Sequence, residues 1–139
     1  MTGTVVVKQV TRQSLALDDY NGTYLGGIHF AATGCTNPAD NTPPSEAPLA
    51  TITIAQNGQQ VTITISIVGI AITITGTLSQ DGQFGSMTGT YSAPGGEVGN
   101  ASITQMNVQT NAFSASFSLQ STNFGCLETG YVAGIRSRT

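Results

Sequence analysis

Residues 49–79 read LATITIAQNGQQVTITISIVGIAITITGTLS. Isoleucine or valine alternates here with threonine or serine, which is the period-two pattern of strands with one buried and one exposed face. Asn57-Gly58 and Val68-Gly69 interrupt the alternation, and both dipeptides suit tight hairpin turns because glycine accepts a positive φ. The stretch therefore predicts three consecutive antiparallel strands, at 49–56, 61–67 and 70–79.

The alternation continues on both sides of this stretch, whereas helical periodicity is nearly absent. In the segment 100–109 it slips between Ile103 and Met106, which predicts a β-bulge there. Together with the central three, the remaining segments predict an all-β domain of eight strands. These further predicted strands are 22–32, 83–93, 100–109, 112–120 and 127–135.

Two segments do not fit the alternation. Residues 35–48, CTNPADNTPPSEAP, contain four of the five prolines. Because proline has no N–H to donate to a strand ladder, we predict an irregular surface loop there. Residues 1–21, which include TVVVKQVTR, are interpreted as an N-terminal segment that forms either an extra strand or a cover over one barrel end. Residues 22–139 are then a single β-barrel domain.

The two cysteines indicate how the strands close. Cys35 follows the first predicted strand, and Cys126 precedes the last one. In an eight-stranded up-and-down order these two positions lie at the same end of the sheet, so a disulfide between them would join neighbouring first and last strands. We therefore predict a closed antiparallel meander barrel. A β-sandwich is the alternative fold, and a pair of free thiols is the alternative to the disulfide.

Charged residues make up only 8% of the chain, against about 25% in an average globular domain. Such a composition, with a disulfide, is typical of secreted, cell-surface or periplasmic proteins. The four basic residues lie near the two ends of the chain, so we expect no nucleic-acid partner. No charged, long apolar stretch follows Met1, so we expect neither a secretory signal nor a membrane span, and interpret the chain as a mature secreted region.

The residue types give little basis for catalysis. His29, the only histidine, has the opposite parity to its strand neighbours Ile28 and Phe30, so either His29 faces outward, as we expect, or those two residues do. A lone histidine makes neither a metal site nor a Ser-His-Asp triad. The acids Asp81 and Glu97 fall in predicted turns, whereas carboxylate catalysis needs two acids across one cleft. We therefore expect no enzymatic activity, metal or cofactor.

An eight-stranded barrel either fills its interior with side chains or holds one small ligand. The inward residues predicted here are apolar or aromatic, so the leading functional hypothesis is binding of a small hydrophobic molecule. The predicted lumen residues are Tyr24, Ile28, Phe30, Ile63, Ile65, Ile72, Ile74, Phe113, Phe117 and Tyr131.

Gly22-Thr23-Tyr24 in the first strand, with Arg136 after the last one, resembles the calycin pattern. In lipocalins, a G-x-W motif near the first strand packs against an arginine close to the end of the barrel. Tyr24 stands here in place of the tryptophan, because the chain contains none. The resemblance implies a cation–π contact of Arg136 or Arg138 with Tyr24. In its general composition and strand pattern, the chain is similar to small barrel domains of bacterial secreted lipoproteins.

An alternative function is a structural or adhesive extracellular subunit. Pilus subunits are similarly poor in charge, rich in threonine and disulfide-bonded, and they assemble through an N-terminal donor strand. Val5, Val7 and Val10 could form such an extension and add to a neighbouring copy. Self-association through the threonine-rich outer face belongs to the same class. Here threonine is explained more simply as a β-branched residue that tolerates water.

Overall fold

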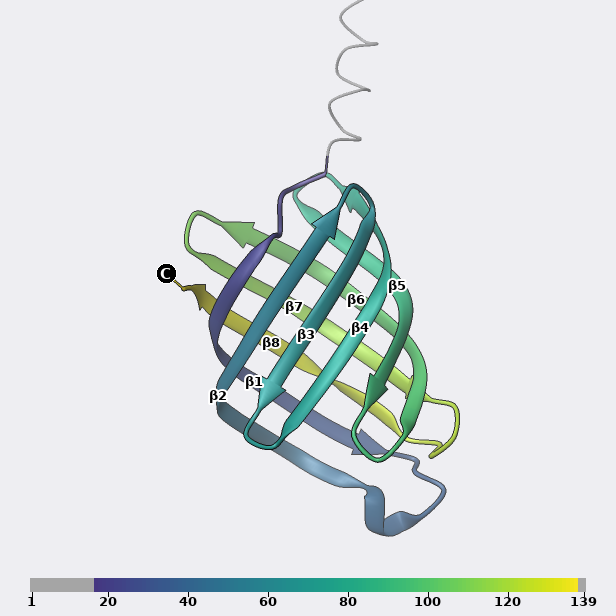
Figure 1. The fold of residues 1–139 in the computed structure, drawn as a ribbon. Helices are drawn as coiled ribbons and strands as arrows, with labels where there is room; N and C mark the ends of the chain where they lie inside the picture. The colour runs from purple at the N-terminus through teal and green to yellow at the C-terminus, as the bar shows by residue number, and fades with distance from the viewer. Residues whose placement is uncertain (1–16, 138–139) are drawn as a thin grey trace, which may run out of the picture.

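A computed structural model describes residues 17–137 of the chain. The eight predicted strands form a closed barrel in which each strand is antiparallel to its neighbours and β1 pairs with β8 (Figure 1). The barrel prediction is thus confirmed over the sandwich. The strands are β1 (Gly22–Thr33), β2 (Thr42–Asn57), β3 (Gln60–Ile67), β4 (Ile70–Asp81), β5 (Phe84–Ala93), β6 (Glu97–Gln109), β7 (Ala112–Ser121) and β8 (Leu127–Arg136).

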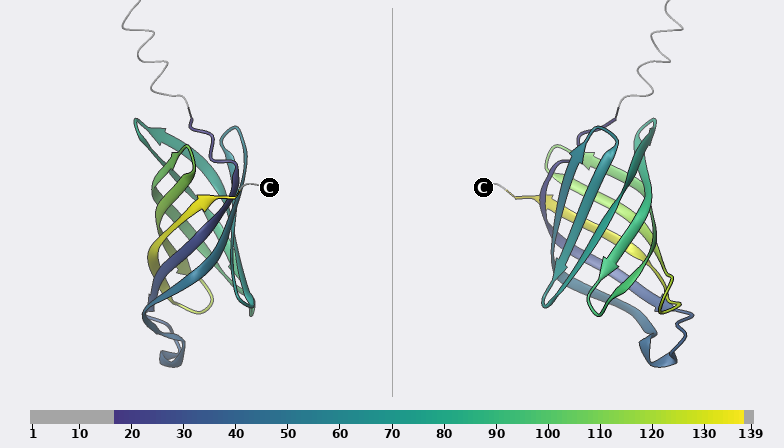
Figure 2. Two further views of the ribbon diagram at one scale, coloured as in Figure 1. Left: turned by 90° about the vertical axis from the view of Figure 1, so that its left-hand side faces the viewer. Right: turned by 45° about the vertical axis from the view of Figure 1, so that its right-hand side comes forward.

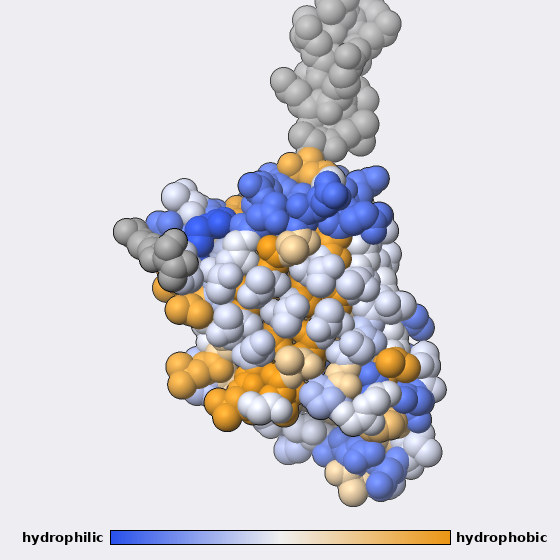
Figure 3. All heavy atoms as spheres, viewed as in Figure 1, coloured by the Kyte–Doolittle hydropathy of each residue, from blue (hydrophilic) through white to orange (hydrophobic). Residues whose placement is uncertain are grey.

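The alternation sorts side chains between the interior and the outer surface. The apolar residues of the central strands form paired layers inside, as with Ile63 opposite Ile74. The threonines form rows outside: Thr64 of β3 pairs with Thr53 of β2 and with Thr73 of β4. In Figure 3 the middle of this face is accordingly near white, between a blue upper band and an orange lower edge.

The predicted irregularity in β6 is confirmed as a β-bulge. The register shifts between Thr104 and Asn107, and Gln105 has a φ of 52°. Because of the extra residue, both Ile103 and Met106 point into the core although their spacing is odd. The bulge therefore explains why the alternation slips in the sequence.

The prediction of an irregular loop throughout 35–48 is wrong for its second half. After a short 3-10 helix, η1 (Pro38–Asp40), the chain enters β2 at Thr42 and pairs with β1. The register shifts twice, and the strand prolines lie in these irregular stretches: Pro43 and Pro44 in one, Pro48 in the other. Proline is tolerated at such positions because no ladder N–H is needed there.

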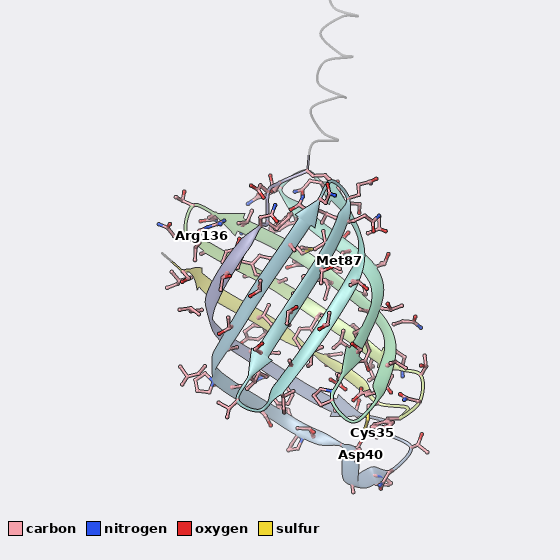
Figure 4. All side chains as sticks on the ribbon, viewed as in Figure 1. Cys35, Asp40, Met87 and Arg136 are labelled. Carbon is pink, nitrogen blue, oxygen red and sulfur yellow. A yellow bond between two sulfur atoms is a disulfide. The ribbon has the colours of Figure 1, made fainter. Side chains whose placement is uncertain are left out.

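The predicted disulfide between Cys35 and Cys126 is present. It lies at the barrel end where β1 finishes and β8 begins, next to the segment containing η1, which projects beyond the barrel (Figures 2 and 4). The two cysteines form a small apolar cluster with Ala32 and Phe124, separate from the main core. An oxidising environment is compatible with this bond.

Close strand approach in the barrel wall depends on glycine. Gly76 of β4 pairs with Gly89 of β5. A Cβ on Gly76 would overlap the carbonyl of Thr88, and one on Gly89 would overlap that of Thr75. Residues with side chains are therefore excluded from this pair unless the backbone moves.

Candidate ligand-binding cavity

The two ends of the barrel differ. At the end opposite the disulfide, Tyr20 precedes β1 and its ring is fully buried. The ring packs edge-on against Phe113, with centroids 6.2 Å apart, and Phe113 in turn lies 5.3 Å from the ring of Tyr24. The Tyr20 hydroxyl donates to Gln80 Oε1 at 3.0 Å. Within the described residues, this end of the barrel is therefore filled by packed aromatic side chains.

Arg136 completes the closed end. Its Cζ lies 5.0 Å from the centroid of the Tyr24 ring, which confirms the cation–π contact that the calycin-like pattern implies for this arginine. Arg138 lies outside the described residues. Burial is the largest cause that raises the pKa of Tyr24, with the Arg136 charge acting in the opposite direction. Figure 4 shows Arg136 at the end of the barrel opposite Cys35.

A cavity of about 240 Å³ lies toward the disulfide end. It reaches the rim at the β3–β4 and β5–β6 turns, where Ile70 is 48% exposed. The orange group at the lower edge of Figure 3 lies around the β3–β4 turn. The cavity is lined by Ile28, Phe30, Ile65, Ile67, Ile70, Ile72, Ile74, Ala93, Pro94, Glu97, Phe117, Leu119 and Glu128.

Most of the predicted lumen residues lie inside the barrel, but they divide into two groups. Six of the ten line the cavity, whereas Tyr24, Ile63 and Phe113 are buried in the packed core and do not border it. The six are Ile28, Phe30, Ile65, Ile72, Ile74 and Phe117. Packing at the closed end thus shortens the predicted lumen to its disulfide-side half.

The prediction that Tyr131 faces the lumen is wrong. Its side chain is 54% exposed on the outer surface, where its ring stacks on that of His29 at 5.2 Å. His29 is also outside the barrel wall, as predicted. The inward positions of β8 include Gly134, where a Cβ would lie 3.0 Å from the Cβ of Tyr24. Because Tyr24 fills the adjoining interior, position 134 needs a small residue, and Tyr131, of opposite parity, lies on the outer surface.

Two carboxyl groups supply the polar part of the cavity lining. Glu97 begins β6 and Glu128 lies at the start of β8, so their strands flank β7 at the disulfide end. The hydroxyl of Tyr91 donates to Glu97 Oε2 at 2.6 Å. Burial of Glu128, its hydrogen bond with Glu97 and the Glu97 charge raise the pKa of Glu128 to about 8. Glu97 and Glu128 thus interact directly in the cavity lining, and this interaction favours the protonated form of Glu128.

This carboxyl pair is not predicted from the sequence, because Glu97 falls in a predicted turn. Parity was the available signal: Glu97 has the parity of Ala101 and Ile103, and Glu128 that of Val132, all of which are buried. The barrel order then brings the starts of β6 and β8 to the same end as Cys126. The parity of the two acids and the order of the strands can both be read without deciding where the turns lie.

Within residues 17–137, no group of three or more potential metal ligands is present. The same residues contain no helix with the length and apolarity required to cross a membrane. Comparison with protein-family models, with curated proteins and with solved structures finds no match. The properties of the cavity are therefore the basis for assigning a function.

Proposed function

We propose that this protein is a secreted, non-enzymatic binding domain that holds a small apolar molecule in the cavity at its disulfide end. The observation that supports the proposal is the cavity itself, about 240 Å³ and bordered mainly by isoleucine and phenylalanine side chains. An apolar cavity of about 150 Å³ is enough to bind benzene. Burial of apolar ligand surface would supply the affinity.

Binding is favoured over hydrolysis by the arrangement of the two acids. Glycosidases separate their catalytic carboxyls so that a sugar or water fits between them. Glu97 and Glu128 instead lie close enough for Glu97 to raise the pKa of Glu128. The two acids therefore lie together in one part of the cavity lining rather than on opposite sides of a cleft.

The test uses N-phenyl-1-naphthylamine, an apolar fluorophore that brightens when it leaves water. We expect the wild-type protein to bind it saturably and Ile72→Trp to lose most of that binding, because the larger side chain fills the cavity. Ala71→Trp is the matched control, since Ala71 is exposed on the same strand. Circular dichroism checks that both variants fold. Absence of saturable binding to the wild type, or equal binding by both variants, would refute the proposal.

A further inference from the structure

The cavity is polar on one side only. Its hydrocarbon lining comes from β1, β3, β4, β5 and β7, whereas both lining carboxyls come from the starts of β6 and β8. A molecule bound there would therefore meet apolar side chains along most of its length and carboxyl oxygens at one end. This asymmetry suits an amphiphile with a short apolar body and one polar group.

Within residues 17–137, no lysine or arginine lies near these carboxyl oxygens. Among residues 17–137 the only lysine or arginine is Arg136. Arg136 lies at the closed end, where it donates to the Asn21 carbonyl at 2.8 Å and to the Tyr24 hydroxyl at 3.0 Å. No described cation thus neutralises Glu97 or Glu128.

The hydrogen bonds that Glu97 and Glu128 already make leave them as acceptors, not donors, toward a ligand. The Tyr91 hydroxyl already donates a hydrogen bond to Glu97. Burial and the neighbouring Glu97 raise the pKa of Glu128, so the pair favours sharing one proton over offering a free donor. The remaining lone pairs on both groups can only accept hydrogen bonds. A ligand group that offers donors and positive charge complements them.

We propose that the cavity selects small apolar molecules that carry a protonated amine, with the ammonium group bound by Glu97 and Glu128 and the hydrocarbon part against Ile28, Ile72 and Phe117. This proposal rests on the proposed binding function. An ammonium group has three donors and no acceptor, and its hydrogen bonds to a carboxylate are about twice as strong as neutral ones. A ligand carboxylate would instead place like charges together, so fatty acids are disfavoured.

The experiment compares octylamine, octanol and octanoate, which share one hydrocarbon chain, by isothermal titration calorimetry on the wild-type protein at neutral pH. We expect octylamine to bind about tenfold more tightly than octanol, because one charge-assisted hydrogen bond is worth that ratio. Octanoate should bind most weakly. This comparison uses no variant, so its result does not depend on a substitution being tolerated.

Glu97→Gln then tests which group recognises the amine. It should lower octylamine affinity about tenfold and leave octanol affinity nearly unchanged. Asp81→Asn, which removes an exposed carboxylate from the β4–β5 turn at the other end, is the matched control and should change neither.

Two results would overturn the inference while leaving the proposed function intact: octanol binding as tightly as octylamine, or octanoate binding more tightly than either. The inference would also be overturned if Asp81→Asn lost the octylamine preference as Glu97→Gln does. Removing a distant charge would then act in the same way as removing Glu97. If the wild type binds neither the octyl compounds nor N-phenyl-1-naphthylamine, the proposed function itself fails.

Discussion

Arg136 and Tyr24 are 112 positions apart in the chain, and the guanidinium of Arg136 both lies over the Tyr24 ring and donates to its hydroxyl at 3.0 Å. Because Tyr24 belongs to β1 and Arg136 ends β8, the contact joins the first and last strands at the closed end. It does so without a covalent bond, whereas the disulfide joins the same two strands at the cavity end.

Arg136→Met should destabilise the barrel by about 1–3 kcal/mol, because it removes the cation–π contact and two charge-assisted hydrogen bonds while keeping an apolar stem. Urea unfolding followed by circular dichroism measures the loss. Arg136→Lys is the matched variant. It keeps the positive charge but loses the planar guanidinium group, so its stability should lie between those of the wild type and Arg136→Met. Equal stability of all three proteins would show that the contact contributes nothing.

Removal of the disulfide by Cys35→Ala with Cys126→Ala should lower the free energy of unfolding by about 2–5 kcal/mol. The bond closes a segment with a sequence separation of 91, so it restricts the unfolded chain strongly. Urea unfolding of the double variant, compared with the oxidised and the reduced wild type, measures the change. The reduced wild type and the double variant should agree, and an oxidised protein no more stable than either would contradict the prediction.

Glu128 should make stability depend on pH. Its pKa is raised from 4.5 to about 8 in the folded protein, so the folded state binds more protons than the unfolded chain between these values. The contribution is therefore fully present below 4.5 and is lost as pH rises through about 8. Glu128→Gln should abolish this decline, giving a higher Tm than the wild type at about pH 9 and a similar Tm at about pH 5.

Thermal unfolding by circular dichroism at both pH values tests the Glu128 prediction. Asp81→Asn is the control, because it removes one negative charge at an exposed turn far from the cavity. The prediction fails if the wild type and Glu128→Gln lose stability in parallel as the pH is raised.

Gly89→Ala should destabilise the barrel by about 1–3 kcal/mol, the usual range for overpacking. The added methyl group would overlap the Thr75 carbonyl on the neighbouring strand. The exposed neighbour Thr88→Ala should change the free energy of unfolding by no more than about 0.5 kcal/mol. Guanidinium unfolding of the two variants checks the difference, and equal values would mean that the strands can separate locally at no cost.

The fold could be predicted from the sequence because a period-two pattern reports directly which side of a strand is buried. It was sufficient for every strand of the barrel and for the bulge near Gln105. The start of β2, at residues 42–48, was not predicted as a strand, because proline is normally evidence against a strand. The strand prolines lie where the register shifts, and a bulge requires no donor from them.

The cavity was harder to predict than the barrel. Parity identifies the inward residues, but it does not say which of them touch each other: Tyr24 and Phe113 fill one end, and only the remaining inward residues border open space. Tyr131 was misplaced because β8 has larger apolar residues on its outer face than on its inner one. The pairing of Glu97 with Glu128 depends on contacts across β7, which no local pattern records.

Seven of the eight strand junctions in a meander are made by the chain itself, and the eighth, between β1 and β8, is the one at which a barrel can split open. In this protein the Cys35–Cys126 bond supplies that eighth link at the rim of the cavity. At this rim the bond therefore keeps the β1–β8 seam from parting. A molecule entering the proposed binding cavity would then pass beside the β3–β4 and β5–β6 turns that border it, so we expect entry to be controlled at these turns rather than at the seam.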